Sequence, residues 1–380
     1  MKNIRIHIVW LWSCILLMLL TACSSSSDNE EEQLLEAAKP TMLTIYLYSP
    51  DQPIVTRADV GPVSASEAEN KVNSIQLWVF DTSGNKIGYL STTETASLNY
   101  GQGAVYQIPV SDEFALNRPN VDVYVLANVT ATNCGITTTL DENTTREQLI
   151  EQAKITVNHY GVTAGSLTTT VPDEGLPMAG VLTDQHVTGD APVLRIGTTG
   201  NITTVPLTRA VSKLRFFFAN NDVVGAPALT ITGIALNGSL IPNEEYLFPN
   251  SLSLNYDPTP APILANSIAV QKKENPDQYV YDGKTAQEYE NLMMGAGLSQ
   301  AGPYYLRESG KIVEGTITYT IEGNTETKTA NFKLQQAGDF SRNHIWIVYA
   351  YYAASGNLQV QSLYVKDWST KELNYKYFNW

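Results

Sequence analysis

Apolar and polar residues alternate along most of the chain, a pattern that predicts short β-strands rather than long helices. Leu43, Ile45 and Leu47 alternate with Thr44 and Tyr46. Successive side chains of a strand point to opposite faces, so this is the pattern of a half-buried strand. The same reasoning predicts strands at residues 75–80, 86–90, 104–110, 121–127, 206–218, 229–236, 313–321, 329–334, 345–352 and 358–365.

Turn residues divide these strands into a recognisable architecture. Residues 81–85 contain a glycine and join two predicted strands into a hairpin. Thr144 with Glu147, and Thr285 with Glu288, have the spacing of capping boxes and predict short helices. Many short strands between Gly, Pro and Asn turns are typical of β-sandwiches. We therefore expect an all-β fold, mainly β with a few short helices, in two tandem sandwich domains at residues 58–200 and 201–380.

The N-terminus has the features of an export signal. Lys2 and Arg5 precede an apolar run at residues 8–20, which is too short for an ordinary membrane span of about 20 residues. Leu20-Thr21-Ala22-Cys23 follows at once, and small residues before a cysteine are what a lipoprotein signal peptidase requires. We expect a signal peptide at residues 1–22, lipidation of Cys23, and a location at the outer membrane. Residues 23–57 then form an acidic tether and the first strand.

Charge and composition exclude several classes of function. The chain has 380 residues and a net charge of −14, which disfavours nucleic acid because its binding depends on Lys and Arg. Cys14 and Cys23 belong to the signal, so Cys134 has no partner for an intrachain disulfide and is predicted to be buried. The four histidines, His7, His159, His186 and His344, show no metal-ligand or catalytic spacing. We expect no enzyme activity, metal or cofactor, although counting carboxylates does not exclude a glycosidase pair.

Several phrases resemble one family when they are taken in order. They are Thr56-Arg57-Ala58, the strand Ile75 to Asp81, Leu176-Pro177-Met178-Ala179-Gly180, Leu207 to Leu214 with Arg209 and Lys213, Tyr246-Leu247-Phe248-Pro249, Tyr304 to Glu308, Arg342-Asn343-His344 and Val365-Lys366-Asp367-Trp368. Together they resemble the fimbrillin superfamily, the type V pilin subunits of Bacteroides- and Porphyromonas-type fimbriae, over residues 41–368. The acidic residues after Cys23 also resemble a surface-export signal of Bacteroidetes lipoproteins, and a solvated tether is the alternative.

The resemblance implies a structural or adhesive fimbrial subunit made of transthyretin-like sandwiches. It also implies cleavage by an Arg-specific protease, here between Arg57 and Ala58. The cut would release the strand that carries Leu43, Ile45 and Leu47. If that strand lies at a sheet edge, its loss exposes an apolar groove that a neighbouring subunit's strand can fill. Residues 61–70, rich in Gly, Pro, Ser and Glu, are expected to be an exposed loop, where proteolytic nicking concentrates.

The donor strand and the role in the fimbrium are left open by the sequence. Candidate donor residues are Leu363, Val365, Leu373, Tyr375 and Tyr377, and the alternative is that residues 358–365 complete their own sheet. The expected partners are other fimbrial subunits, the outer membrane through the lipid, the protease, and a ligand on a host or bacterial surface. Two alternatives do not polymerise: a fimbrial anchor, or a glycan-binding lipoprotein with exposed aromatics such as Trp78 or Tyr351.

Overall fold

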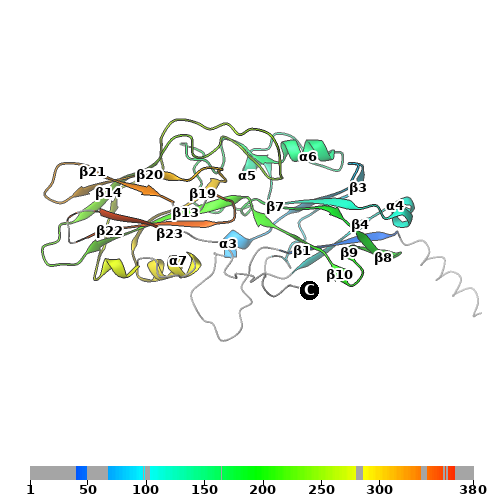
Figure 1. The fold of residues 1–380 in the computed structure, drawn as a ribbon, viewed down its shortest axis with the longest axis horizontal. Coiled ribbons are helices and arrows are strands. Elements are labelled where there is room, and N and C mark those ends of the chain that lie inside the picture. Colours follow the sequence, from blue (N-terminus) through cyan, green and yellow to red (C-terminus); the bar gives the residue numbers. More distant parts are fainter. Residues whose placement is uncertain are drawn as a thin grey trace, which may run out of the picture.

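The chain folds into two β-rich halves that lie end to end (Figure 1). The computed structural model describes residues 40–48, 67–96, 98, 103–163, 165–279, 286–334, 340–353, 356 and 358–363. Within these residues, no helix is both long and apolar enough to cross a membrane. The expectation of a mainly β fold with a few short helices is confirmed.

The first half is built from two facing sheets. One contains β1 (Met42–Tyr48), β4 (Ala104–Pro109), β8 (Val187–Asp190), β9 (Val193–Thr198), β10 (Asn201–Ile202) and β11 (Thr204–Pro206). The other has the order β12 (Thr208–Arg209), β7 (Met178–Gln185), β5 (Val121–Ala127), β2 (Ile75–Asp81) and β3 (Lys86–Thr92). Strands β10, β11 and β12 pair with strands of this half, so the second half starts after Arg209 and not at the predicted residue 201.

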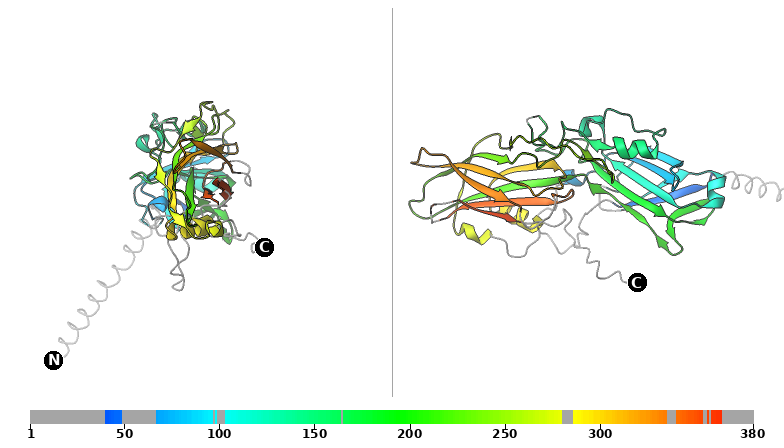
Figure 2. Two further views of the ribbon diagram at one scale, coloured as in Figure 1. Left: turned by 90° about the vertical axis from the view of Figure 1, so that its left-hand side faces the viewer. Right: turned by 45° about the horizontal axis from the view of Figure 1, so that its top comes forward.

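The second half repeats the two-sheet arrangement (Figure 2). One sheet contains β13 (Val211–Asn221), β18 (Lys272–Lys273), β19 (Ser299–Arg307), β22 (Ile345–Tyr352) and β23 (Leu358–Leu363). The other contains β14 (Leu229–Leu236), β16 (Ala261–Pro262), β17 (Ile268–Ala269), β20 (Glu314–Ile321) and β21 (Lys328–Lys333). A short ladder between β6 (Lys154–Ile155) and β15 (Glu245–Tyr246) connects the two halves.

Short helices occupy the connections. They are α3 (Glu67–Asn70), α4 (Asp112–Asn117), α5 (Ala131–Cys134), α6 (Arg146–Gln152), α7 (Ala286–Gly295) and the 3-10 turn η2 (Pro276–Tyr279). The capping box of α6 uses Thr145 and Gln148, one residue later than predicted. Thr144 instead accepts a hydrogen bond from the backbone N–H of Asp141, which closes the preceding turn. The second predicted box includes Thr285, which lies outside the described residues.

Three apolar cores hold the described part of the molecule together. The first-half core lies between the first two sheets and includes Leu43, Ile45, Leu47, Leu77 and Val125. The second-half core includes Phe216, Phe218, Ile317 and Val348. The junction core contains residues of both halves, among them Trp78, Tyr124, Phe217, Ile345 and Tyr349.

Successive side chains of a strand point to opposite faces, so one strand can contribute residues to two cores. On β13, Phe216 and Phe218 belong to the second-half core, whereas Phe217 between them belongs to the junction core. On β2, Leu77 and Val79 face the first-half core and Trp78 the junction core. A strand that is buried on both faces has a continuous run of apolar residues, as residues 77–80 and 216–218 do.

Candidate functional site

Strand β1 lies inside its sheet and not at an edge. It pairs antiparallel with β4 over residues 42–47. On its other side it pairs parallel with β9 over residues 42–44 and with β11 over residues 46–48. The edge expectation was wrong because the order of strands in a sheet is set by residues far away in the chain. We call the space that β1 fills between these neighbours the β1 slot.

The inward side chains of β1 are completely buried. Leu43, Ile45 and Leu47 each have 0% exposure and belong to the first-half core. Thr44, between them, is 3% exposed, so this part of the outward face is also covered. Full burial of an aliphatic side chain stabilises by about 1.5–3 kcal/mol, so three such residues bind β1 firmly.

On both sides of the β1 slot, a wall strand approaches the opposite sheet closely. On one side, a Cβ atom at Gly88 of β3 would overlap Ile108 of β4, so these two strands approach closely. On the other side, a Cβ at Gly180 of β7 would lie 2.5 Å from Pro206 O of β11. Glycine permits a close approach, and at these two positions it lets a wall strand pack against the facing sheet.

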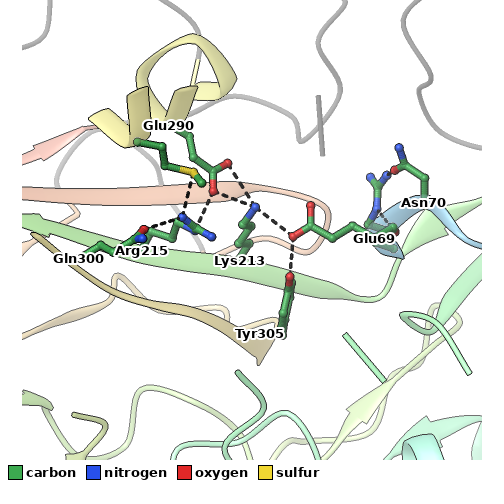
Figure 3. A network of polar contacts seen from close by, with 9 residues as sticks. Glu69, Asn70, Lys213, Arg215, Glu290, Gln300 and Tyr305 are labelled. Carbon is green, nitrogen blue, oxygen red and sulfur yellow. Dashed lines mark hydrogen bonds and ion pairs between the residues drawn. The ribbon is translucent and has the colours of Figure 1, made fainter. Parts of the chain in front are cut away.

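A buried network of charged groups lies where the two halves meet (Figure 3). Lys213 Nζ on β13 is 2.9 Å from Glu69 Oε1 on α3 and 2.9 Å from Glu290 Oε1 on α7. Arg215 Nε lies 2.7 Å from the same Glu290 oxygen. Tyr305 OH on β19 donates to Glu69 Oε1. We call these five residues the junction network.

Electrostatics keep Glu69 ionised despite its position. Burial alone would raise the pKa of its carboxyl, but Lys213, Tyr305 and Arg209 together outweigh burial and hold this pKa below its usual value. Within the network, the two carboxylates Glu69 and Glu290 face Lys213 and Arg215. Such a cluster fits a structural role in joining elements and offers no activated nucleophile.

Residues 207–209 contact the chain on both sides of the predicted processing segment. Arg209 Nε donates to Glu69 O at 3.1 Å, and its Nη2 donates to Asn70 Oδ1. Two residues earlier, Leu207 N–H donates to Tyr48 O at 2.9 Å, at the end of β1. Tyr48 and residues 69–70 are therefore both hydrogen-bonded to residues 207–209. Residues 67–70 are helical here, and the expectation of an exposed loop was wrong for Glu69 and Asn70, which are buried.

A second group of charges also connects the halves. Glu245 on β15 accepts the backbone N–H of Glu308 at 2.6 Å and lies 3.0 Å from Arg342 Nη2. Burial raises the pKa of Glu245 to about 7, against the opposing effect of Arg342. Arg307 donates to backbone carbonyls of Thr156 and Pro242, one in each half. A pocket of about 390 Å³ lies beside these residues, but its charged groups pair with one another.

The sequence of this chain matches one family model over most of its length. A family described as fimbrillin-A associated anchor proteins Mfa1 and Mfa2 matches residues 37–280. The chain belongs to this family. A comparison with curated proteins gives no match. The matched range contains β1, both slot walls and the Glu69, Arg209 and Lys213 parts of the junction.

Several solved structures are similar to this fimbrillin-associated protein. The tip fimbrial protein Mfa3 from Porphyromonas gingivalis, with a C-terminal truncation, is 14% identical, with 86% of this chain and 99% of that chain covered at a TM-score of 0.46. A fimbrial assembly protein from Parabacteroides distasonis is 12% identical, with coverages of 86% and 100% and a TM-score of 0.42. The fimbrial anchor protein Mfa2 from Porphyromonas gingivalis is 9% identical, with coverages of 87% and 100% and a TM-score of 0.37.

Family membership confirms the resemblance seen in the sequence. The chain is a fimbrial protein, and membership of this family implies that it interacts with other fimbrial proteins. Among the residues described, no cluster of His, Cys, Asp and Glu could hold a metal ion. Cys134 is buried as predicted, and burial raises the pKa of its thiol.

The remaining predicted site residues of this fimbrillin-associated protein fall into two groups. Cys23, Arg57, Ala58, Val365, Leu373, Tyr375 and Tyr377 lie outside the described residues. Leu363 ends β23, which pairs antiparallel with β22, so residues 358–363 complete their own sheet. Trp78 is buried and its Nε1 donates to Asp141 O, which removes it as an exposed sugar-stacking residue. Tyr351 is half-buried and stacks on Tyr349.

Proposed function

We propose that this protein is a subunit of cell-surface fimbriae that assembles by exchanging β1 for a strand of a neighbouring subunit. It is exported as a lipoprotein on Cys23 and is cut between Arg57 and Ala58 by an Arg-specific protease. The observation that carries the proposal is the β1 slot. Its occupant contributes three fully buried aliphatic side chains and is joined to the remaining chain through the segment that contains Arg57.

The position of β1 makes its replacement more demanding than the loss of an edge strand. Removing β1 leaves unpaired backbone groups on β4 and also on β9 and β11. Unpaired backbone groups in a buried place are costly, so the empty slot is strongly driven to take another strand. Since each wall also packs against the facing sheet, we expect the incoming strand to meet a formed slot.

The N-terminus of surface-purified protein tests the proposal. We expect mass spectrometry to find Ala58 as the first residue of assembled protein. An Arg57→Ala variant should keep residues 23–57 and should not form multimers. Arg118→Ala is the matched control, since Arg118 is a surface arginine whose side chain is 38% exposed, and it should assemble normally. Assembly of the uncut Arg57→Ala variant into normal multimers would contradict the proposal.

A second candidate function is a fimbrial anchor that keeps its lipid. The description of the matched family, which names anchor proteins, favours it. An anchor would retain β1 and acylated Cys23 in all mature molecules. The same mass spectrum distinguishes the two functions, and Arg57→Ala would then have no effect on the mature N-terminus.

A further inference from the structure

We propose that the β1 slot rejects residues 364–380 of a second copy and accepts a partner strand with aliphatic side chains at three alternate positions. This inference rests on the proposed function, because the slot has to open before it can be filled. It concerns the identity of the partner strand: the strand that enters this slot is not the C-terminal segment of a like chain.

The side chains of β1 define what the slot accepts. The three inward positions hold leucine, isoleucine and leucine, and each is completely buried. Protein interiors are packed as densely as organic crystals, so even one additional methylene has a measurable effect. Between the first two inward positions, Thr44 lies opposite Gln107 on β4 and Arg195 on β9 and is also covered. A replacement strand therefore needs three aliphatic residues with a small residue after the first.

Residues 358–380 of the same chain do not provide such a strand. Residues 358–363 already form β23 and pair with β22. In the sequence of residues 364–380, three successive alternate positions that are all apolar or aromatic occur only at Leu373, Tyr375 and Tyr377. Whichever direction this segment runs, two of the three inward positions receive a tyrosine.

Two tyrosines in these positions conflict with the slot in both volume and polarity. A tyrosine is larger than the isoleucine or leucine it would replace, and overpacking forces neighbouring side chains out of their preferred rotamers. Each phenolic hydroxyl would also enter an apolar core, where a hydroxyl without a hydrogen-bond partner is unfavourable. The neighbouring side chains belong to the first-half core, which is made of apolar residues such as Leu77, Val79 and Val125.

Peptide exchange into the full-length chain tests this selectivity. A recognition sequence for a specific protease replaces residues 54–60, and Cys23→Ser keeps the protein soluble. After cutting, three labelled peptides are offered: residues 40–48, residues 370–378, and residues 40–48 with Ile45→Tyr and Leu47→Tyr. The third peptide is the matched control, because it differs from β1 only in the two tyrosines. Binding is followed by fluorescence anisotropy.

The possible outcomes test the selectivity of the slot and strand exchange itself separately. We expect the β1 peptide to bind, and both tyrosine-bearing peptides to bind at least about 30-fold more weakly. If the 370–378 peptide binds within threefold of the β1 peptide, the selectivity is wrong while strand exchange stands. If the β1 peptide itself never enters the cut protein, the slot does not exchange, and the proposed function fails together with the selectivity that rests on it.

Discussion

Glu69 faces Lys213 across the junction of the two halves, and both side chains are at most 5% exposed. We predict that Glu69→Gln destabilises the protein by about 3 kcal/mol or more, because removing one partner leaves the other charge buried and incompletely paired. Urea unfolding measures this difference. The same substitution at Glu147, whose side chain is 73% exposed, is the control and should change the free energy of unfolding by less than about 0.5 kcal/mol.

The pH dependence distinguishes a lost ion pair from lost packing. The pKa of Glu69 is lowered in the folded protein, so its contribution is complete above its unfolded value of 4.5 and is lost as pH falls through the folded pKa. The difference in the free energy of unfolding between wild type and Glu69→Gln should therefore be constant around neutral pH and become smaller in acid. An equal difference at pH 7 and at pH 3 would show that the charge is not what matters.

Single residues differ in how much the sequence reveals about them. Cys134 was predicted to be buried from its type and lack of a partner, and it is. Glu69 lies in a stretch of acidic and small residues, and no local feature separates it from an ordinary solvated charge. Its burial depends on Lys213 and Tyr305, which tertiary folding brings to it. The one available signal was the family phrase containing Arg209 and Lys213, whose basic residues both contact α3.

At the scale of elements, alternation predicted strands well and their pairing poorly. The strands at residues 75–80, 121–127, 229–236 and 345–352 are present, because strong apolar periodicity is a local property. Strands β9 and β19 were not predicted, and β19 contains Gly302 and Pro303, which interrupt its pattern. The central position of β1 depends on β9 and β11, far along the chain, which no local pattern encodes.

A reversible covalent lock on β1 tests whether this strand must leave. Pro109 lies opposite Met42 and has no N–H, so this is a non-hydrogen-bonded pair, and by alternation Tyr46 and Val105 form another. Cα atoms in such pairs are about 4.5 Å apart, within the range of a disulfide. We predict that oxidised Tyr46→Cys/Val105→Cys protein is cut after Arg57 but keeps residues 23–57 and does not assemble.

Reduction and single cysteines provide the controls for this lock. A reductant should restore assembly of the double variant, followed as detergent-stable multimers on gels. Each single cysteine variant should assemble with or without reductant. Cys134 does not compete for the new bond because it is buried and the pKa of its thiol is raised. Normal assembly of the oxidised double variant would mean that β1 stays in place in the fimbrium.

At the scale of the whole molecule, β1 packs in a different core from the one that joins the two halves. All three inward residues of β1 belong to the first-half core, and none of them to the junction core. The junction core and the junction network use β2, β5, β13, β19 and β22 together with α3 and α7. Exchange at the β1 slot therefore leaves the connection between the halves intact, so the halves of an assembled subunit stay joined.

The shared junction core also predicts that the two halves unfold together. Interfaces between domains of one chain are usually more polar and allow independent motion, whereas here Tyr124 packs edge-on against Phe248 with ring centroids 5.0 Å apart, inside a core common to both halves. We expect one calorimetric transition. Leu77→Ala in the first-half core and Ile317→Ala in the second-half core should each lower this single Tm, since each removes about 2–5 kcal/mol. Two transitions, with each variant moving only one, would show that the halves are held by the chain connection and not by the core they share.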